Sequence, residues 1–136
     1  MDGEKNLGIL LASMKPEMSS ESYVFSVFPR MSQELLRLNP WAVIREEEGY
    51  TAILEEQAAP RMDAAGQGVF RRITLNIHSS LEAVGLTAAV SSVLADAGIS
   101  ANVVAGCFHD HIFVPRNRAA EALRRLEELS REKSVQ

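Results

Sequence analysis

The chain has 136 residues, of which 46% are hydrophobic and 24% are charged, and its formal net charge is −4. This size and composition are typical of one soluble globular domain, or of two very small ones that share a core. The acidic balance argues against a nucleic-acid binder that neutralises phosphates, and a single cysteine, Cys107, excludes an internal disulfide and a cysteine-rich zinc site.

The N-terminal segment carries acids and only a short apolar run, so we expect neither a signal peptide nor a membrane span, and a cytoplasmic location. Residues 7–14 form that run, which ends at Lys15 and Pro16 and predicts a buried strand. Residues 23–28 are rich in aromatic and β-branched side chains and predict a second strand.

Residues 32–38 predict a short helix with Ser32 as its N-cap. Residues 41–46 and 50–55 flank Glu48 and Gly49 and predict a hairpin. Residues 58–68 mix proline, glycine and alanine without an apolar period, which indicates a linker. We therefore expect two half-units, residues 1–60 and residues 61–136.

The second half has a clearer pattern. Apolar residues at 69, 73, 75 and 77 alternate with polar residues at 72, 74, 76 and 78, as in a strand with one buried face. Apolar residues recur at helical spacing from Leu86 to Ala97, and Gly98 marks the helix end. Residues 102–107 and 112–114 predict two strands joined by a turn through residues 108–110, and residues 119–129 predict a last amphipathic helix.

The order β-α-β-β-α in the second half lacks the last strand of a ferredoxin-like βαββαβ unit. We expect residues 7–14 to supply that strand and to complete the C-terminal sheet, as in a circular permutation. The predicted fold class is therefore α+β, with two tandem ferredoxin-like units of which the first is degenerate.

The strings HSSLEAVGLTAAVSSVLADAGIS (78–100) and ANVVAGCFHDHIFVP (101–115) resemble the ACT domain. The strings KPE (15–17), YVF (23–25) and REEEGYTAIL (45–54) extend this resemblance to the first half. More narrowly, the chain resembles small bacterial two-unit ACT proteins, which are related to the ACT units of aspartate kinases and to cytosolic arginine sensors. The resemblance implies a regulatory module that binds an amino acid or a similar small molecule, without catalytic activity and without a cofactor.

The loop before the predicted helix at residue 86 has features that suit such a ligand. Ser79 and Glu82 fit a capping box, Gly85 lets the backbone approach a partner, and free amides at a helix start favour a carboxylate. A plainer interpretation is that these residues only cap and pack the helix. The ligand-binding residues that we expect are Ser79, Ser80, Glu82, Gly85, Leu86, Thr87, Asn102 and Val103, with Glu82 or Asn102 available for an ammonium group.

An alternative is a metal- or thiol-dependent enzyme that uses His78, Cys107, His109 and Asp110. However, Asp110 is a good turn residue, and the histidines can flank a hairpin without a metal. Cys107 follows an apolar strand, so a buried and unreactive thiol is expected. We therefore expect no metal site. We also expect a homodimer, because open sheet edges are usually covered, and neither a nucleic acid nor a membrane as a partner.

Overall fold

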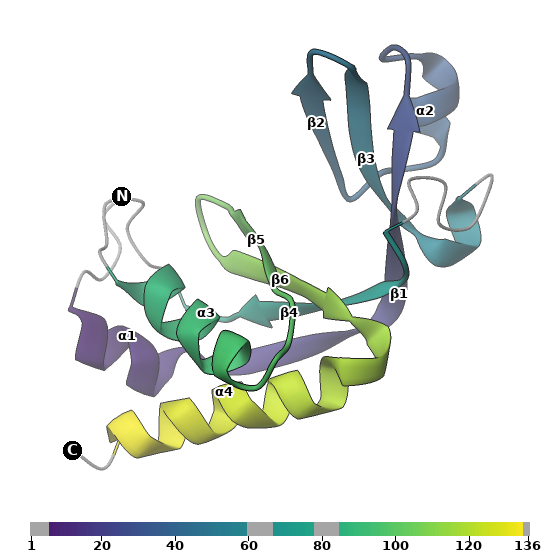
Figure 1. Ribbon diagram of the computed structural model, residues 1–136. Coiled ribbons are helices and arrows are strands. Elements are labelled where there is room, and N and C mark those ends of the chain that lie inside the picture. The colour runs from purple at the N-terminus through teal and green to yellow at the C-terminus, as the bar shows by residue number, and fades with distance from the viewer. Residues whose placement is uncertain (1–5, 60–66, 78–84, 135–136) are drawn as a thin grey trace. The chain divides into compact units, whose positions relative to one another are not determined.

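The computed structural model describes residues 6–59, 67–77 and 85–134 (Figure 1). The chain divides into two compact units, of which unit 1 is Met1–Ser19 with Arg71–Gln136 and unit 2 is Ser20–Phe70. The N-terminal segment therefore belongs with the second half of the chain. The boundary expected at residues 60 and 61 lies outside the described residues and stays a prediction.

Unit 1 is a sheet with helices packed on one face (Figure 1). Its strands, in hydrogen-bonded order, are the first part of β1 (Pro16–Phe28), then β4 (Phe70–Leu75), β6 (Asp110–Pro115) and β5 (Asn102–Ala105). Its helices are α1 (Leu7–Ser13), α3 (Leu86–Asp96) and α4 (Ala119–Ser134), and a 3-10 turn, Arg116–Arg118, precedes α4. Strands β5 and β6 are antiparallel, with Val103 opposite Ile112.

The core of unit 1 lies between this sheet and its helices. Alternating residues of β4 and β6 face it, as the period-2 pattern predicts. Its buried members are Leu10, Leu11, Met14, Ile73, Leu75, Leu86, Val90, Leu94, Ile99, Ile112, Val114, Ala119, Ala122 and Leu126. Helices α1 and α4 are also joined by a hydrogen bond of 3.0 Å from Ser130 Oγ to the carbonyl of Ala12.

The prediction of a strand over residues 7–14 is wrong, because this segment contains helix α1. Its apolar residues recur at helical spacing, so that Leu10, Leu11 and Met14 are buried while Ile9 is 52% exposed. The side chain of Asn6 caps the helix by accepting the N–H of Ile9 at 3.1 Å. The segment that pairs with β4 is instead the start of β1.

Unit 2 contains the end of β1, helix α2 (Gln33–Arg37), strands β2 (Ala42–Glu46) and β3 (Gly49–Glu55), and a 3-10 turn, Glu56–Ala58. The predicted cap of α2 is confirmed, since Ser32 Oγ accepts the N–H of Leu35 at 3.1 Å. The predicted hairpin is confirmed as well, with Glu46 opposite Gly49. Strand β3 pairs antiparallel with β1 on its other side. The buried core cluster around α2 consists of Val24, Leu35, Ala52 and Leu54.

Helix α3 ends at Gly98, as predicted. The N–H of Gly98 donates to the carbonyl of Ala95, and the N–H of Ile99 donates to the carbonyl of Leu94, both at 2.9 Å. This is a Schellman motif, and it needs the left-handed backbone of Gly98, whose φ is +71°. The guanidinium of Arg118 strengthens this end by donating to the carbonyl of Ala97 at 2.9 Å.

Candidate functional site

The candidate site begins where helix α3 begins. Gly85 is the N-cap of α3 and has a φ of +96°. Glycine has no side chain, so it cannot cap the helix itself, and the N–H groups of the first turn have no acceptor within the helix. The predicted capping box is not the cap of α3, which starts at Leu86. Ser79, Ser80 and Glu82 lie outside the described residues.

Part of the predicted site converges in space. Leu86, Thr87 and Val103 line a narrow cavity of about 10 Å³ between the start of α3 and the sheet. The other residues that line it are Leu75, Val90, Asp110 and Ile112. Asn102 is not among them, because it faces away from this cavity and its Nδ2 donates to the carbonyl of Phe113 at 3.5 Å.

The ligand-binding residues predicted from the sequence do not include Asp110, which lines this cavity. The sequence pattern predicts a turn at Asp110, but Asp110 is the first residue of β6, and alternation along this strand puts it on the same face as Ile112. Burial raises the pKa of the Asp110 carboxyl above its ordinary value of 3.8, and the nearby His109 acts in the opposite direction. Asp110 is thus an acidic group at the wall of an otherwise mostly apolar cavity.

Because Asp110 is partly buried, we expect its replacement by a neutral residue to stabilise the folded protein in a pH-dependent way. The pKa of Asp110 in the folded protein lies above its pKa in the unfolded chain. At pH values between these two pKa values, the folded state therefore binds more protons than the unfolded state. Stability therefore falls as the pH rises through this window. We expect Asp110→Asn to have a higher melting temperature than the wild type at pH 7, and the difference to vanish near pH 3.

The matched control for this prediction is Glu127→Gln, which neutralises an exposed carboxylate on α4. It is expected to leave the melting temperature unchanged at both pH values, because surface substitutions have small effects. A lower melting temperature of Asp110→Asn at pH 7 would show that the carboxylate stabilises the fold.

The histidines lie on the other face of this hairpin. His111 Nδ1 and Thr74 Oγ1 are 2.9 Å apart, and the rings of His109 and His111 meet edge to face with centroids 6.3 Å apart. Burial lowers the pKa of His111, and the positive charges of Arg72 and His109 lower it further. Among the described residues, no group of three or more histidine, cysteine, aspartate or glutamate side chains could hold a metal ion, and His78 lies outside them.

The expectation that Cys107 is buried is wrong. Strand β5 ends at Ala105, and the N–H of Gly106 donates to the carbonyl of His109 at 2.9 Å, which closes the turn of the hairpin. Cys107 therefore lies in this turn, where it is exposed.

The fold and the sequence agree with a known family. Two ACT domain models match the chain, over residues 2–71 and residues 70–128. The chain therefore belongs to the ACT domain family and contains two such domains in tandem. The predicted resemblance and the predicted α+β, ferredoxin-like fold class are confirmed. Within the described ranges, no helix has both the length and the apolar character that crossing a membrane requires.

Solved structures with the same fold include a protein of unknown function from Vibrio cholerae, described as a possible transport protein. It is 48% identical to this chain, with a TM-score of 0.78, and the match covers 88% of this chain and 92% of that one. The ligand-free regulatory subunit of aspartate kinase from Thermus thermophilus is 8% identical, with a TM-score of 0.62 and coverages of 86% and 97%.

A protein from Agrobacterium tumefaciens is also similar, at 15% identity, with a TM-score of 0.62 and coverages of 85% and 87%. These two more distant likenesses support the fold alone. None of the curated proteins compared with the chain matches it.

Proposed function

We propose that this chain is a regulatory module that binds an amino acid and has no catalytic activity of its own. ACT domains are typically regulatory ligand-binding modules, and the fold is shared with an aspartate kinase regulatory subunit. The observation that carries the proposal is the meeting of Thr87, at the start of α3, and Asp110, at the start of β6, on one cavity.

The two ends of this cavity have the chemistry that an amino acid needs. The first-turn N–H groups of α3, including those of Leu86 and Thr87, favour a carboxylate, because they are unpaired within the helix and lie at its positive end. The carboxylate of Asp110 suits the ammonium group. Ser79, Ser80 and Glu82 remain predicted contributors, and Asn102 does not line the cavity.

The size of the cavity limits what it holds. Its volume of about 10 Å³ is close to the room needed for one water molecule. We therefore place only the ammonium and carboxylate end of the ligand at this cavity. The cavity must widen to admit that end. A regulatory site of this kind couples ligand binding to a change in the positions of α3 and β6.

The test is a thermal-shift screen of the whole chain against the twenty amino acids, followed by calorimetric titration of each hit. A ligand at 100 times its dissociation constant raises the free energy of unfolding by about 2.7 kcal/mol. We expect Asp110→Asn to weaken the hit at least about tenfold, or about 1.4 kcal/mol. Thr87→Val is expected to retain most of the binding, because it keeps the backbone N–H that faces the carboxylate.

The control is Glu17→Gln, which is expected to bind the hit like the wild type because Glu17 does not line this cavity. The proposal fails if no amino acid changes the melting temperature, or if Asp110→Asn binds the hit unchanged. Binding that is lost only in Glu17→Gln would move the site to the opposite face of the sheet.

The homodimer stays a prediction. Strand β5 is the last in the hydrogen-bonded order of unit 1, and an edge strand presents unpaired backbone groups that a second copy could cover.

A further inference from the structure

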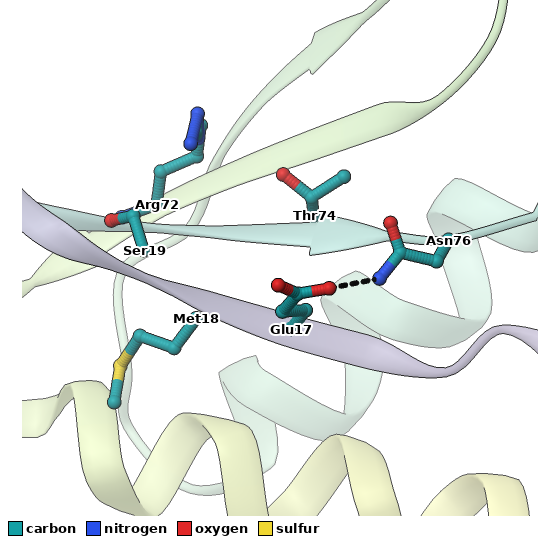
Figure 2. Close-up of a pocket in the computed structure, with 6 residues that line it drawn as sticks. All are labelled: Glu17, Met18, Ser19, Arg72, Thr74 and Asn76. Carbon is teal, nitrogen blue, oxygen red and sulfur yellow. Dashed lines mark hydrogen bonds between the residues drawn. The ribbon is translucent and has the colours of Figure 1, made fainter.

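A second and larger cavity lies on unit 1, with a volume of about 230 Å³. It is lined by Glu17, Met18 and Ser19 from β1, and by Arg72, Thr74 and Asn76 from β4 and the residue after its end (Figure 2). Alternation along β4 puts Arg72 and Thr74 on the face opposite Ile73 and Leu75, which belong to the core. This cavity therefore lies on the face of the sheet that α3 does not cover.

One end of the cavity is negative. The carboxylate of Glu17 accepts a hydrogen bond of 2.8 Å from Asn76 Nδ2 (Figure 2). The same nitrogen donates to the carbonyl of Lys15 at 3.2 Å. Asn76 is thereby tied to the backbone of the neighbouring strand, and it holds the Glu17 carboxylate toward this end.

The other end is positive. Arg72 carries a guanidinium and is anchored through its backbone N–H, which donates to Ser19 Oγ at 3.2 Å. Figure 2 shows Arg72 and Asn76 at opposite ends of the cavity, with Thr74 between them. The hydroxyl of Thr74 is 2.9 Å from His111 Nδ1, so the middle of the cavity is polar and its hydroxyl is oriented by a neighbour.

The offset between the backbones of Glu17 and Arg72 follows from the pairing of the strands. Arg72 is bonded to Ser19, which lies two residues after Glu17, and two residues of strand span about 7 Å. A ligand whose charged ends are about 7 Å apart places each end directly beside one of these residues, whereas the ammonium and carboxylate of an α-amino acid, which are attached to one carbon atom, do not have this spacing. A linear molecule with several bonds between its charged ends fits the offset.

We propose that this cavity binds a small zwitterion of the ω-amino acid or dipeptide type, with its ammonium group at Glu17 and its carboxylate at Arg72. A ligand with one charge would pair with one end and be repelled by the other, whereas a zwitterion pairs with both. The cavity volume lies just below the range of about 300–1,000 Å³ that is typical of small-molecule pockets, which suits a compact ligand. This site goes beyond the proposed amino-acid site and shares no lining residue with it.

The probe is 6-aminohexanoate, titrated into the whole chain by calorimetry, with hexanoate and hexylamine as singly charged comparisons. We expect 6-aminohexanoate to bind at least about tenfold more tightly than either comparison. Glu17→Gln and Arg72→Gln are each expected to weaken it at least about tenfold. Backbone amide shifts in NMR spectra are expected to concentrate at Ser19, Thr74 and Asn76.

Two further variants keep the test decisive. Arg72→Lys retains the charge and is expected to retain most of the binding, which separates loss of charge from loss of fold. Glu127→Gln, on the exposed surface of α4, is expected to bind like the wild type. The proposal is overturned if 6-aminohexanoate does not bind at millimolar concentration, if hexanoate or hexylamine binds equally well, or if Asp110→Asn weakens the binding as much as Glu17→Gln.

Discussion

Replacing Leu10 with alanine is expected to lower the free energy of unfolding by about 2–5 kcal/mol. Leu10 is fully buried in the core of unit 1, so its truncation removes apolar contacts and leaves a cavity. Helix α1 is short, and helices of this length are marginal without tertiary packing. Its buried face therefore holds it in place, and the loss should appear in a urea denaturation curve as a lower midpoint with an unchanged slope.

The neighbouring residue supplies the control. Ile9 is 52% exposed, so Ile9→Ala is expected to change the free energy of unfolding by no more than about 0.5 kcal/mol. Equal losses for both variants would contradict the helical assignment of this segment. Leu11→Ala offers a second check, because residues 10 and 11 are both buried on a helix, whereas they would point to opposite faces of a strand.

Replacing Gly49 with alanine is expected to cost at least about 2 kcal/mol, because strain and crowding act together. Gly49 opens strand β3 with a φ of +147°, which side chains rarely allow. An added Cβ atom would also lie 2.8 Å from the carbonyl oxygen of Phe28, and this neighbour is backbone that cannot rotate away. Denaturation monitored by near-ultraviolet circular dichroism measures the loss.

The variant Gly98→Ala separates the cost of backbone strain from the cost of crowding. Gly98 also has a positive φ, of +71°, but no atom lies within 4 Å of an added Cβ. We expect only the cost of the left-handed backbone there, about 1–2 kcal/mol. If Gly98→Ala is as destabilising as Gly49→Ala, then the contact with Phe28 contributes nothing to the requirement for glycine at residue 49.

The elements that the sequence predicted well are those with their own local signals. Helix α3 has a long apolar period and a glycine stop, and helix α2 has a serine at its N-cap. The prediction of a strand over residues 7–14 was wrong because an apolar run of this length is compatible with a buried strand or a buried helix. The signal that distinguishes them was present, since Leu7, Leu10, Leu11 and Met14 follow the spacing of one helical face after an asparagine cap.

The sites were harder to predict because their residues are far apart in the sequence. Thr87 and Asp110 meet only after α3 and β5 have packed, and Glu17 and Asn76 come together across 59 residues. Asp110 also had a competing explanation, since aspartate is common in turns. The turn lies between Gly106 and His109, earlier in the chain than the predicted turn through residues 108–110. Asp110 therefore belongs to strand β6 and not to the turn.

The hydrogen bond between Ser130 and Ala12 joins residues 118 positions apart, and this separation has a consequence for how the protein is made. Unit 2 is one continuous segment, Ser20–Phe70, so all of its residues have been synthesised before β4 is completed. Helix α1 is made before unit 2 but packs against α4, which is made after it. Contacts of such long range are slow to form, because loop closure must precede them. During synthesis, the apolar face of α1 therefore stays exposed until α4 has been made, and this helix is open to aggregation in that interval.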